Sequence, residues 1–253
     1  MLSRPGRTRP WSRPWNADSS VIGRRSSTNC EQSRGASSPA KYSGGHLFFI
    51  LQNQPIALQD PWFWIHLAIQ IWLFTGLFIT AHDAMHGTVS KSKIINSFLG
   101  VTSSMLYAGL WYPMLKKKHY LHHQHPATGQ DPDYSVTNQY FLVWWYRFMK
   151  QYVTVWQILI MASLFNLGLL WFSQQQLIIF WIVPAILSTF QLFYFGTYRP
   201  HRMPHDTISA PHFSRSQKRN HLWAMISCYF FGYHLEHHAS PGTPWWQLHR
   251  TKR

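Results

Sequence analysis

The chain has 253 residues, of which 17% are aromatic and only 12% are charged, a balance typical of membrane proteins. Lys and Arg number 23 against 8 acidic residues, and they flank apolar segments, so the basic excess fits anionic lipid headgroups better than nucleic acid. We therefore expect no nucleic-acid partner, and two cysteines without CxxC spacing exclude a disulfide framework.

Residues 1–45 mix Arg, Ser, Pro and Gly with few acids and show no periodic apolar pattern. Such a composition does not form a packed core, and we predict a disordered basic N-terminal tail. An organelle transit peptide or a misassigned start codon would give the same pattern. The remainder, residues 46–253, is predicted to form one membrane domain.

Residues 62–81 form the first segment able to cross a bilayer. They contain no formally charged side chain, although His66 and Gln70 weaken the segment. About twenty residues at 1.5 Å each reach about 30 Å, the thickness of the hydrocarbon core. The segment predicts a transmembrane helix.

The first histidine cluster, His82 and His86, follows this segment directly. Two histidines four residues apart lie on nearly the same face of a helix and can share a metal ion. A pair of interfacial histidines is the simplest alternative. A zinc-protease HExxH motif is another, but Asp83 replaces its glutamate and six further clustered histidines would be left unused. We assign Asp83 to the surroundings of the site rather than to its ligands.

The apolar segment 94–115 is predicted to lie in the interface or to dip into the membrane without crossing it. Two glycines, an asparagine and several Ser and Thr residues dilute its hydrophobicity. A fourth true crossing is the alternative. It would place His86 and His119 on opposite sides of the membrane, where they could not share a metal centre.

The second cluster has the spacing HxxHH and consists of His119, His122 and His123. We leave His125 out of the ligand set because it points to another side of the helix and precedes Pro126. Asp131 and Asp133 follow, and carboxylates of this kind frequently orient metal-binding imidazoles by accepting their second N–H. A plain Asp-Pro-Asp turn is the alternative for these two acids.

Residues 152–172 and 177–198 are predicted to form a transmembrane helical hairpin. The connecting residues 173–176 carry no Lys or Arg, whereas both flanks are rich in them. The positive-inside rule therefore places the connection outside and the flanks on the cytoplasmic side. The fold class that follows is an all-α integral membrane protein, with helical hairpins and a histidine-rich cap on the cytoplasmic side.

The third cluster repeats the HxxHH spacing and consists of His234, His237 and His238. Glu236 points away from these histidines on a helix, which favours an orienting or ion-pair role over ligation. The eight clustered imidazoles exceed the four ligands that saturate one zinc ion, so the pattern predicts two metal ions. Imidazole suits both zinc and copper, so the spacing does not name the metal.

At this point the chain resembles a known family. The three clusters around membrane hairpins are similar to those of the integral-membrane di-iron desaturases and hydroxylases. Longer strings resemble the bacterial and cyanobacterial β-carotene ketolases of that superfamily: TGLFITAHDAMHG at 75–87, LFYFGTYRPHR at 192–202, FGYHLEHH at 231–238 and PWWQL at 244–248. The resemblance covers about residues 60–250.

The resemblance implies a di-iron centre that uses O₂ to convert the C4 methylene of carotenoid β-rings to a ketone. Family members usually hold a ninth histidine upstream of the last cluster, and His201 is the nominee, with His212 and His221 as weaker ones. It also implies a carotenoid that enters from the bilayer and an external electron donor of the ferredoxin type, favoured by the basic cytoplasmic or stromal face. The expected iron ligands are His82, His86, His119, His122, His123, His201, His234, His237 and His238.

Two other functions stay open from the sequence. One is a sister activity, a carotenoid β-ring hydroxylase or a membrane fatty acid desaturase. The other is an inactive or merely metal-binding membrane protein. Family members normally carry another span before the one that leads into the first cluster, and residues 1–60 supply only a short apolar stretch at 46–51. We expect the helix that packs against 62–81 to be missing. Phe230 is a second departure, because ketolases often have another histidine there.

Overall fold

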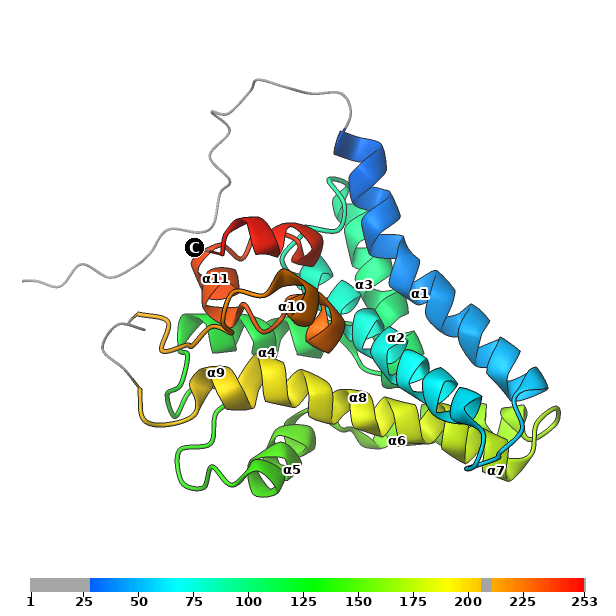
Figure 1. Cartoon of the computed structure of the whole chain (residues 1–253). Coiled ribbons are helices and arrows are strands. Elements are labelled where there is room, and N and C mark those ends of the chain that lie inside the picture. Colours follow the sequence, from blue (N-terminus) through cyan, green and yellow to red (C-terminus); the bar gives the residue numbers. More distant parts are fainter. Residues whose placement is uncertain (1–27, 206–210, 253) are drawn as a thin grey trace, which may run out of the picture.

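The computed structural model of the chain describes residues 28–205 and 211–252, and every regular element in these ranges is helical (Figure 1). Two helices are long and apolar enough to cross a membrane, α2 (Pro61–Met85) and the continuous stretch Gln174–His201. These spans confirm the predicted fold class of an all-α membrane protein. The chain folds so that the ends of both spans converge on the short C-terminal helices (Figure 1).

A helix precedes α2 where the sequence predicted a tail. Helix α1 (Thr28–Asn53) runs alongside α2 in the opposite direction (Figure 1). Ile50 and Leu51 pack with Phe63 of α2 and with two apolar side chains near residue 180. The prediction that no helix packs against 62–81 is therefore wrong, because a short apolar stretch suffices when it packs on a neighbour. The expected tail is helical from Thr28 onward, and residues 1–27 lie outside the described residues.

Segment 94–115 is broken into two helices, as expected of pieces that do not cross. Helix α3 (Lys93–Ala108) ends at Gly109, whose φ of 65° is the left-handed conformation that glycine adopts without strain. Helix α4 (Tyr112–Gln124) then starts in a new direction. The ring of Tyr112 lies against Gly100, where a Cβ atom would approach within 2.4 Å of it. This break turns the second histidine cluster back toward the end of α2.

The predicted span over 152–172 is reduced to a shorter helix over 155–168. Helix α5 (Phe141–Tyr152) and helix α6 (Val155–Gly168) meet at 90°, so they are at most one bent span. Thr154 starts the new helix, because its hydroxyl accepts a hydrogen bond from the Gln157 N–H and the Gln157 side chain accepts one from the Thr154 N–H. Gln157 also donates to the Ala108 carbonyl at 2.7 Å, which ties α6 to the end of α3.

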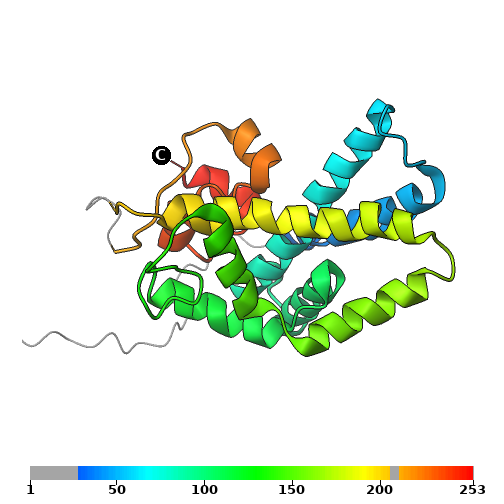
Figure 2. The ribbon, with the colours of Figure 1, turned by 90° about the horizontal axis from the view of Figure 1, so that it is seen from below.

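The second complete span consists of five consecutive helical segments: α7 (Gln174–Leu177), η1 (Ile178–Ile182), α8 (Val183–Phe193), η2 (Tyr194–Tyr198) and α9 (Arg199–His201). Segments η1 and η2 are π-helical turns, which insert an extra residue per turn and often occur at functional sites. Figure 2 shows this span running past the other helices as one long rod. Its end presents His201 to the histidine clusters.

The C-terminal part folds back over α2 as three short helices, α10 (His221–Cys228), α11 (His234–Ala239) and the 3₁₀ helix η4 (Trp245–Arg250). Tyr229 and Phe230 connect α10 to α11 with φ values of 48° and 61°. The Tyr229 ring stacks on Trp72 at 4.2 Å, and Gly76 leaves room for it, because a Cβ there would lie 2.6 Å from the tyrosine oxygen. This contact fixes the third histidine cluster relative to α2.

Candidate metal centre

All nine nominated histidines lie at one end of the molecule and divide into two groups. In each group the nitrogen atoms that could bind a metal lie within 4.8 Å of one another. The first group contains His82, His86, His119, His123 and His237. The second group contains His122, His201, His234 and His238. The number of groups equals the number of metal ions predicted from the sequence.

Each group draws on several elements, so neither can form without the whole fold. The last turn of α2 supplies His82 and its C-cap residue is His86, whereas α4 and α11 each contribute to both groups. On α4 the HxxHH spacing divides its members, since His119 and His123 face the first group and His122 faces the second. The two adjacent histidines of the motif therefore serve different groups.

The imidazoles meet through nitrogen atoms that point at one another. The Nε2 atoms of His86 and His119 are 2.6 Å apart, and those of His123 and His237 are 3.1 Å apart. In the second group His238 Nε2 lies 3.1 Å from the Nε2 atoms of both His122 and His234. Converging lone pairs of this kind repel each other unless a proton or a metal ion lies between them.

Burial keeps most of these imidazoles neutral. It lowers the pKa of His119 and His123 well below the usual value of 6.5, and neighbouring imidazoles lower it further. The same causes lower the pKa of the three histidines of α11. Neutral imidazole is the form that binds metal ions, so these side chains are ready to bind at neutral pH.

His122 is the exception, because an acid faces it. Burial alone lowers the pKa of His122, but the charge of Asp131 and its hydrogen bond more than offset this, and the pKa is raised. Both Asp131 oxygens accept from His122 Nδ1, at 2.9 and 3.0 Å. The carboxylate is itself held by the backbone N–H groups of Ala127 and Asp133, each at 2.9 Å. This arrangement directs Nε2 of His122 into the second group.

Two of the buried nitrogens that lack a partner among the described residues are Nε2 atoms, one in each group. They are Nε2 of His82 and Nε2 of His201, and Nδ1 of His234 and Nδ1 of His238 lack a partner as well. The other ring nitrogen of the first two is occupied, since His82 Nδ1 lies 3.3 Å from Asp83 and His201 Nδ1 donates to the Phe213 carbonyl at 3.0 Å. An unpaired buried acceptor costs free energy, and a metal ion would satisfy it. The donor set therefore fits two metal ions.

The acidic residues nominated as neighbours occupy different places. Asp83 accepts from the Trp245 backbone N–H at 2.8 Å, in addition to facing His82. Asp133 accepts from the Tyr152 hydroxyl, and its second oxygen lies 3.9 Å from His122 Nδ1. Glu236 points away, accepting from Ser216 at 2.5 Å and forming an ion pair with Lys252 at 2.9 Å.

The weaker nominees for a ninth ligand lie outside both groups. The ring of His212 is 5.9 Å from that of His238. His221 is hydrogen-bonded to the Tyr233 hydroxyl at 3.1 Å, and its ring meets that of His249 edge to face. Of the histidines nominated for this role, His201 alone is in a group.

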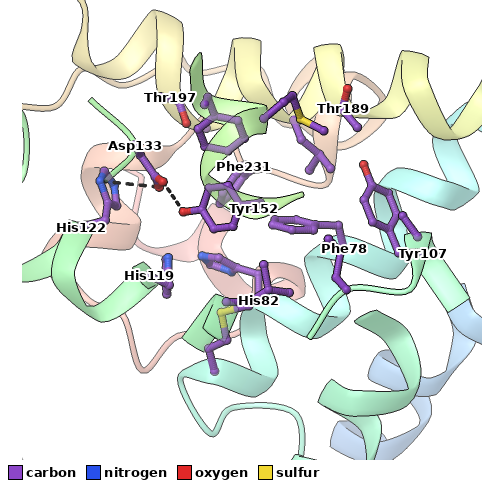
Figure 3. Close-up of a pocket in the computed structure, with 18 of the residues that line it drawn as sticks. Phe78, His82, Tyr107, His119, His122, Asp133, Tyr152, Thr189, Thr197 and Phe231 are labelled. Carbon is purple, nitrogen blue, oxygen red and sulfur yellow. Dashed lines mark hydrogen bonds and ion pairs between the residues drawn. The ribbon is translucent and has the colours of Figure 1, made fainter. Parts of the chain in front are cut away.

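An apolar cavity of about 100 Å³ reaches both groups (Figure 3). His82 and His119 border it from the first group, and His122 and His234 border it from the second. The remaining wall is mostly apolar and aromatic, including Phe78, Leu115, Phe148, Leu192 and Phe231. In Figure 3 the phenyl rings and Tyr152 lie between the histidines and Tyr107 at the other end of the cavity. The arrangement brings an apolar molecule next to two possible metal ions.

Comparison with known proteins agrees with this geometry. The sequence model of the fatty acid desaturase family matches residues 60–159 and 147–253. A β-carotene ketolase of Paracoccus sp. (strain PC1) is 39% identical over 191 residues, covering 74% of this chain and 78% of that protein. The chain belongs to the fatty acid desaturase family, as a relative of its β-carotene ketolases. No solved structure matches.

Other relatives in the desaturase family extend the comparison. A β-carotene 4-ketolase of Protosiphon botryoides is 40% identical over 197 residues, covering 73% of this chain. A zeaxanthin 4-ketolase of Chlamydomonas reinhardtii is 40% identical over 186 residues, covering 72% of this chain. The matched regions span 51% and 42% of these two algal proteins, so this chain corresponds to about half of their length.

Three features of this desaturase-family site were not found from the sequence. They are the Phe213 carbonyl beside His201, the Trp245 N–H beside Asp83 and the Tyr152 hydroxyl beside Asp133. A backbone group leaves no signal in residue type, and Tyr152 was counted as part of a span. The histidines of the three clusters were found from their spacing, and His201 was found from the resemblance to the family.

Proposed function

We propose that this protein is a carotenoid oxygenase that converts the C4 methylene of a β-ring to a ketone, and so turns β-carotene into echinenone and canthaxanthin. The observation that carries the proposal is the apolar cavity whose wall includes histidines of both groups. The names of the relatives supply the substrate class. The activity is proposed for the protein as a whole, and not for the matched residues alone.

Two iron ions, held by His82, His86, His119, His123 and His237 and by His122, His201, His234 and His238, would supply the activation of O₂. The protein contributes the rest. The neutral imidazoles bind without first releasing protons, and Asp131 and the Phe213 carbonyl keep two rings in the required orientation. Iron is favoured over zinc or copper by family membership.

The cavity holds the ring and excludes water. Phe78 and Phe231 both line it (Figure 3), and the ring of Phe231 lies 4.9 Å from that of His82. A carotenoid end-group is an apolar ring, and burial of its surface against these side chains stabilises the bound state by about 25 cal/mol per Å². A wall without water also protects a reactive oxidant from side reactions.

The chemistry requires two successive hydroxylations at the same carbon. Each one inserts one oxygen atom of O₂ into a C–H bond and reduces the other atom to water, which consumes two electrons and two protons. The resulting gem-diol loses water and leaves the ketone. The electrons come from outside, and we infer a ferredoxin-type donor that docks on the basic side, near Lys117 and Arg202. We place this side in the cytoplasm or stroma.

The test is product analysis in a bacterial host that makes β-carotene. Echinenone and canthaxanthin support the proposal. Zeaxanthin would indicate a ring hydroxylase, and an altered fatty acid profile would indicate a desaturase. The desaturase outcome is included because a dihydrorhizobitoxine desaturase of Bradyrhizobium elkanii is 29% identical over 233 residues.

The alternative of an inactive or merely metal-binding protein needs a second experiment. Expression of the full chain and of a chain starting at Thr28 keeps α1 in both cases. Ketone from either one contradicts an inactive protein. No ketone from either, with two metal ions bound in both, would favour a metal-binding protein over an oxygenase.

A further inference from the structure

Helix α10 carries an apolar face that the described residues leave uncovered. Leu222, Trp223 and Ile226 are 71%, 55% and 53% exposed. Steps of one, three and four residues place them on one side of the helix. The opposite side is packed, since Ala224 and Cys228 are fully buried. Exposed apolar side chains gathered in this way indicate a site that contacts lipid or another protein.

The contacts of α10 place its end beside the apolar part of both spans. The Ser227 carbonyl accepts a hydrogen bond from Gln191 at 2.5 Å, and the Tyr229 ring stacks on Trp72. Gln191 precedes Arg199, the first formal charge at that end of its span, by about 12 Å of helix. Trp72 precedes Asp83 by about 16 Å. The end of α10 therefore lies deeper than the charged boundary of either span.

The two ends of the segment 220–233, which contains α10, lie next to each other. The backbone N–H of Asn220, the N-cap of α10, donates to the Tyr233 hydroxyl at 3.2 Å, so the two ends of the segment lie together. Between them the turn at Tyr229 and Phe230 reverses the direction, closed by a hydrogen bond from the Phe230 N–H to the Ala224 carbonyl at 2.8 Å. Figures 1 and 2 show α10 folded over the crossing of α2 and α8.

The residues that precede α10 are basic. Lys218 and Arg219 are exposed and lie just before the N-cap. Lysine and arginine beside an inserted apolar segment attract anionic lipid headgroups. This charge pattern favours a lipid surface over a second protein as the phase that covers the apolar face.

We propose that residues 220–233 form a re-entrant hairpin that enters the bilayer from the side of the metal centre, with Leu222, Trp223 and Ile226 in contact with lipid acyl chains. Lys218 and Arg219 stay at the level of the phosphates. Backbone polar groups inside the membrane must be paired, and the Ser227 carbonyl meets this requirement through Gln191. Because His234 follows the hairpin directly, insertion in the lipid also positions the third histidine cluster. The inference does not depend on the proposed reaction.

The test uses the full chain in vesicles of phosphatidylcholine and phosphatidylglycerol, with its two native cysteines replaced by alanine. Single cysteines are placed at Trp223 and Ile226, and at Arg219 as the matched exposed control. A water-soluble maleimide reacts with the thiolate, which an apolar surrounding disfavours. We expect the cysteines at 223 and 226 to react on the order of tenfold more slowly than the one at 219, and all three to react equally after denaturation in SDS.

A nitroxide at the same positions separates lipid from protein as the cover. In lipid, the label at 226 collides often with dissolved oxygen and rarely with a water-soluble nickel complex. Under a second copy of the chain it collides rarely with both, and in water it collides often with the nickel complex. Either of the last two results, or equal maleimide rates at 219 and 226, overturns the proposal. All three labelled positions are exposed, and the Cys228→Ala change on the packed side of α10 is common to every variant, so it does not affect the comparison.

Discussion

Asp131 holds His122 with both carboxylate oxygens, at 2.9 and 3.0 Å from Nδ1. The carboxylate is buried and is itself fixed by two backbone N–H groups. His122 in turn presents Nε2 to the second histidine group. The orientation of the His122 ring therefore depends on a residue that does not belong to the second group.

Replacing this acid should weaken metal binding without removing a ligand. We expect Asp131→Asn to lower the metal affinity of the second group by roughly 10- to 100-fold, the usual effect of losing an orienting partner. The measurement is metal content of the purified protein after dialysis against a chelator of graded strength. Glu236→Gln is the matched control, because that acid bonds to Ser216 and Lys252 instead. A loss of metal in the control equal to that in Asp131→Asn would contradict the assignment.

His201 gives a sharper test of the ligand set. Its Nε2 atom is buried without a partner among the described residues, whereas His212 lies beside the second group without joining it. We expect His201→Ala to weaken metal binding by the second group, which keeps three histidines, so that a chelator removes this ion before the ion of the first group, which keeps all five. His212→Ala should leave both ions in place. The measurement is the metal content of both variants after iron reconstitution and exposure to the chelator. Loss of an ion in His212→Ala alone would mean that His212, and not His201, is the ninth ligand.

The cavity wall depends on the close approach of η2 and the third cluster. A Cβ atom at Gly196 would lie 2.1 Å from the ring of Phe231, and both residues line the cavity. We expect Gly196→Ala to push this ring toward the cavity and to lower kcat/KM, with a stability loss of about 1–3 kcal/mol from overpacking. Gly129→Ala is the control, since nothing lies within 4 Å of its added atom.

The readout for this variant is ketone formation together with the thermal midpoint and the metal content. Retained metal with reduced turnover is the expected combination, because Gly196→Ala removes no histidine from either group. Unchanged turnover would mean that Phe231 moves away from the cavity, and the ring would then have no part in binding the substrate.

The sequence predicted which histidines gather better than it predicted the helices. The HxxHH spacing is a local pattern, so His119, His122 and His123 could be found without knowing the fold. Their division between two groups could not, because it depends on how α4 lies between α2 and α11. The bend at Thr154 was missed, because the span was predicted from its mean hydropathy, which does not show where a capping residue starts a new helix. Helix α1 was missed because its apolar stretch is short and is stabilised by packing on α2.

The buried histidines also set how the metal-free protein responds to acid. Burial lowers the pKa of His119, His123, His234, His237 and His238 well below 6.5, whereas the pKa of His122 is raised by Asp131. A histidine with a lowered pKa binds fewer protons in the folded state than in the unfolded state below pH 6.5. The free energy of unfolding therefore falls as the pH falls through that value.

These five histidines act in this direction, whereas His122 and the Asp133 carboxyl, whose pKa burial raises, act in the other, so the net effect is destabilisation by acid. Each contributes up to about 1.4 kcal/mol per pH unit below 6.5. We expect the thermal midpoint of the metal-free protein in detergent to be constant above pH 7 and to fall steeply between pH 6.5 and 5. Bound iron should shift the fall to lower pH, because protons must then displace the metal. A midpoint that rises on acidification would show that the imidazoles are protonated in the folded protein, and they would not then be poised to bind metal.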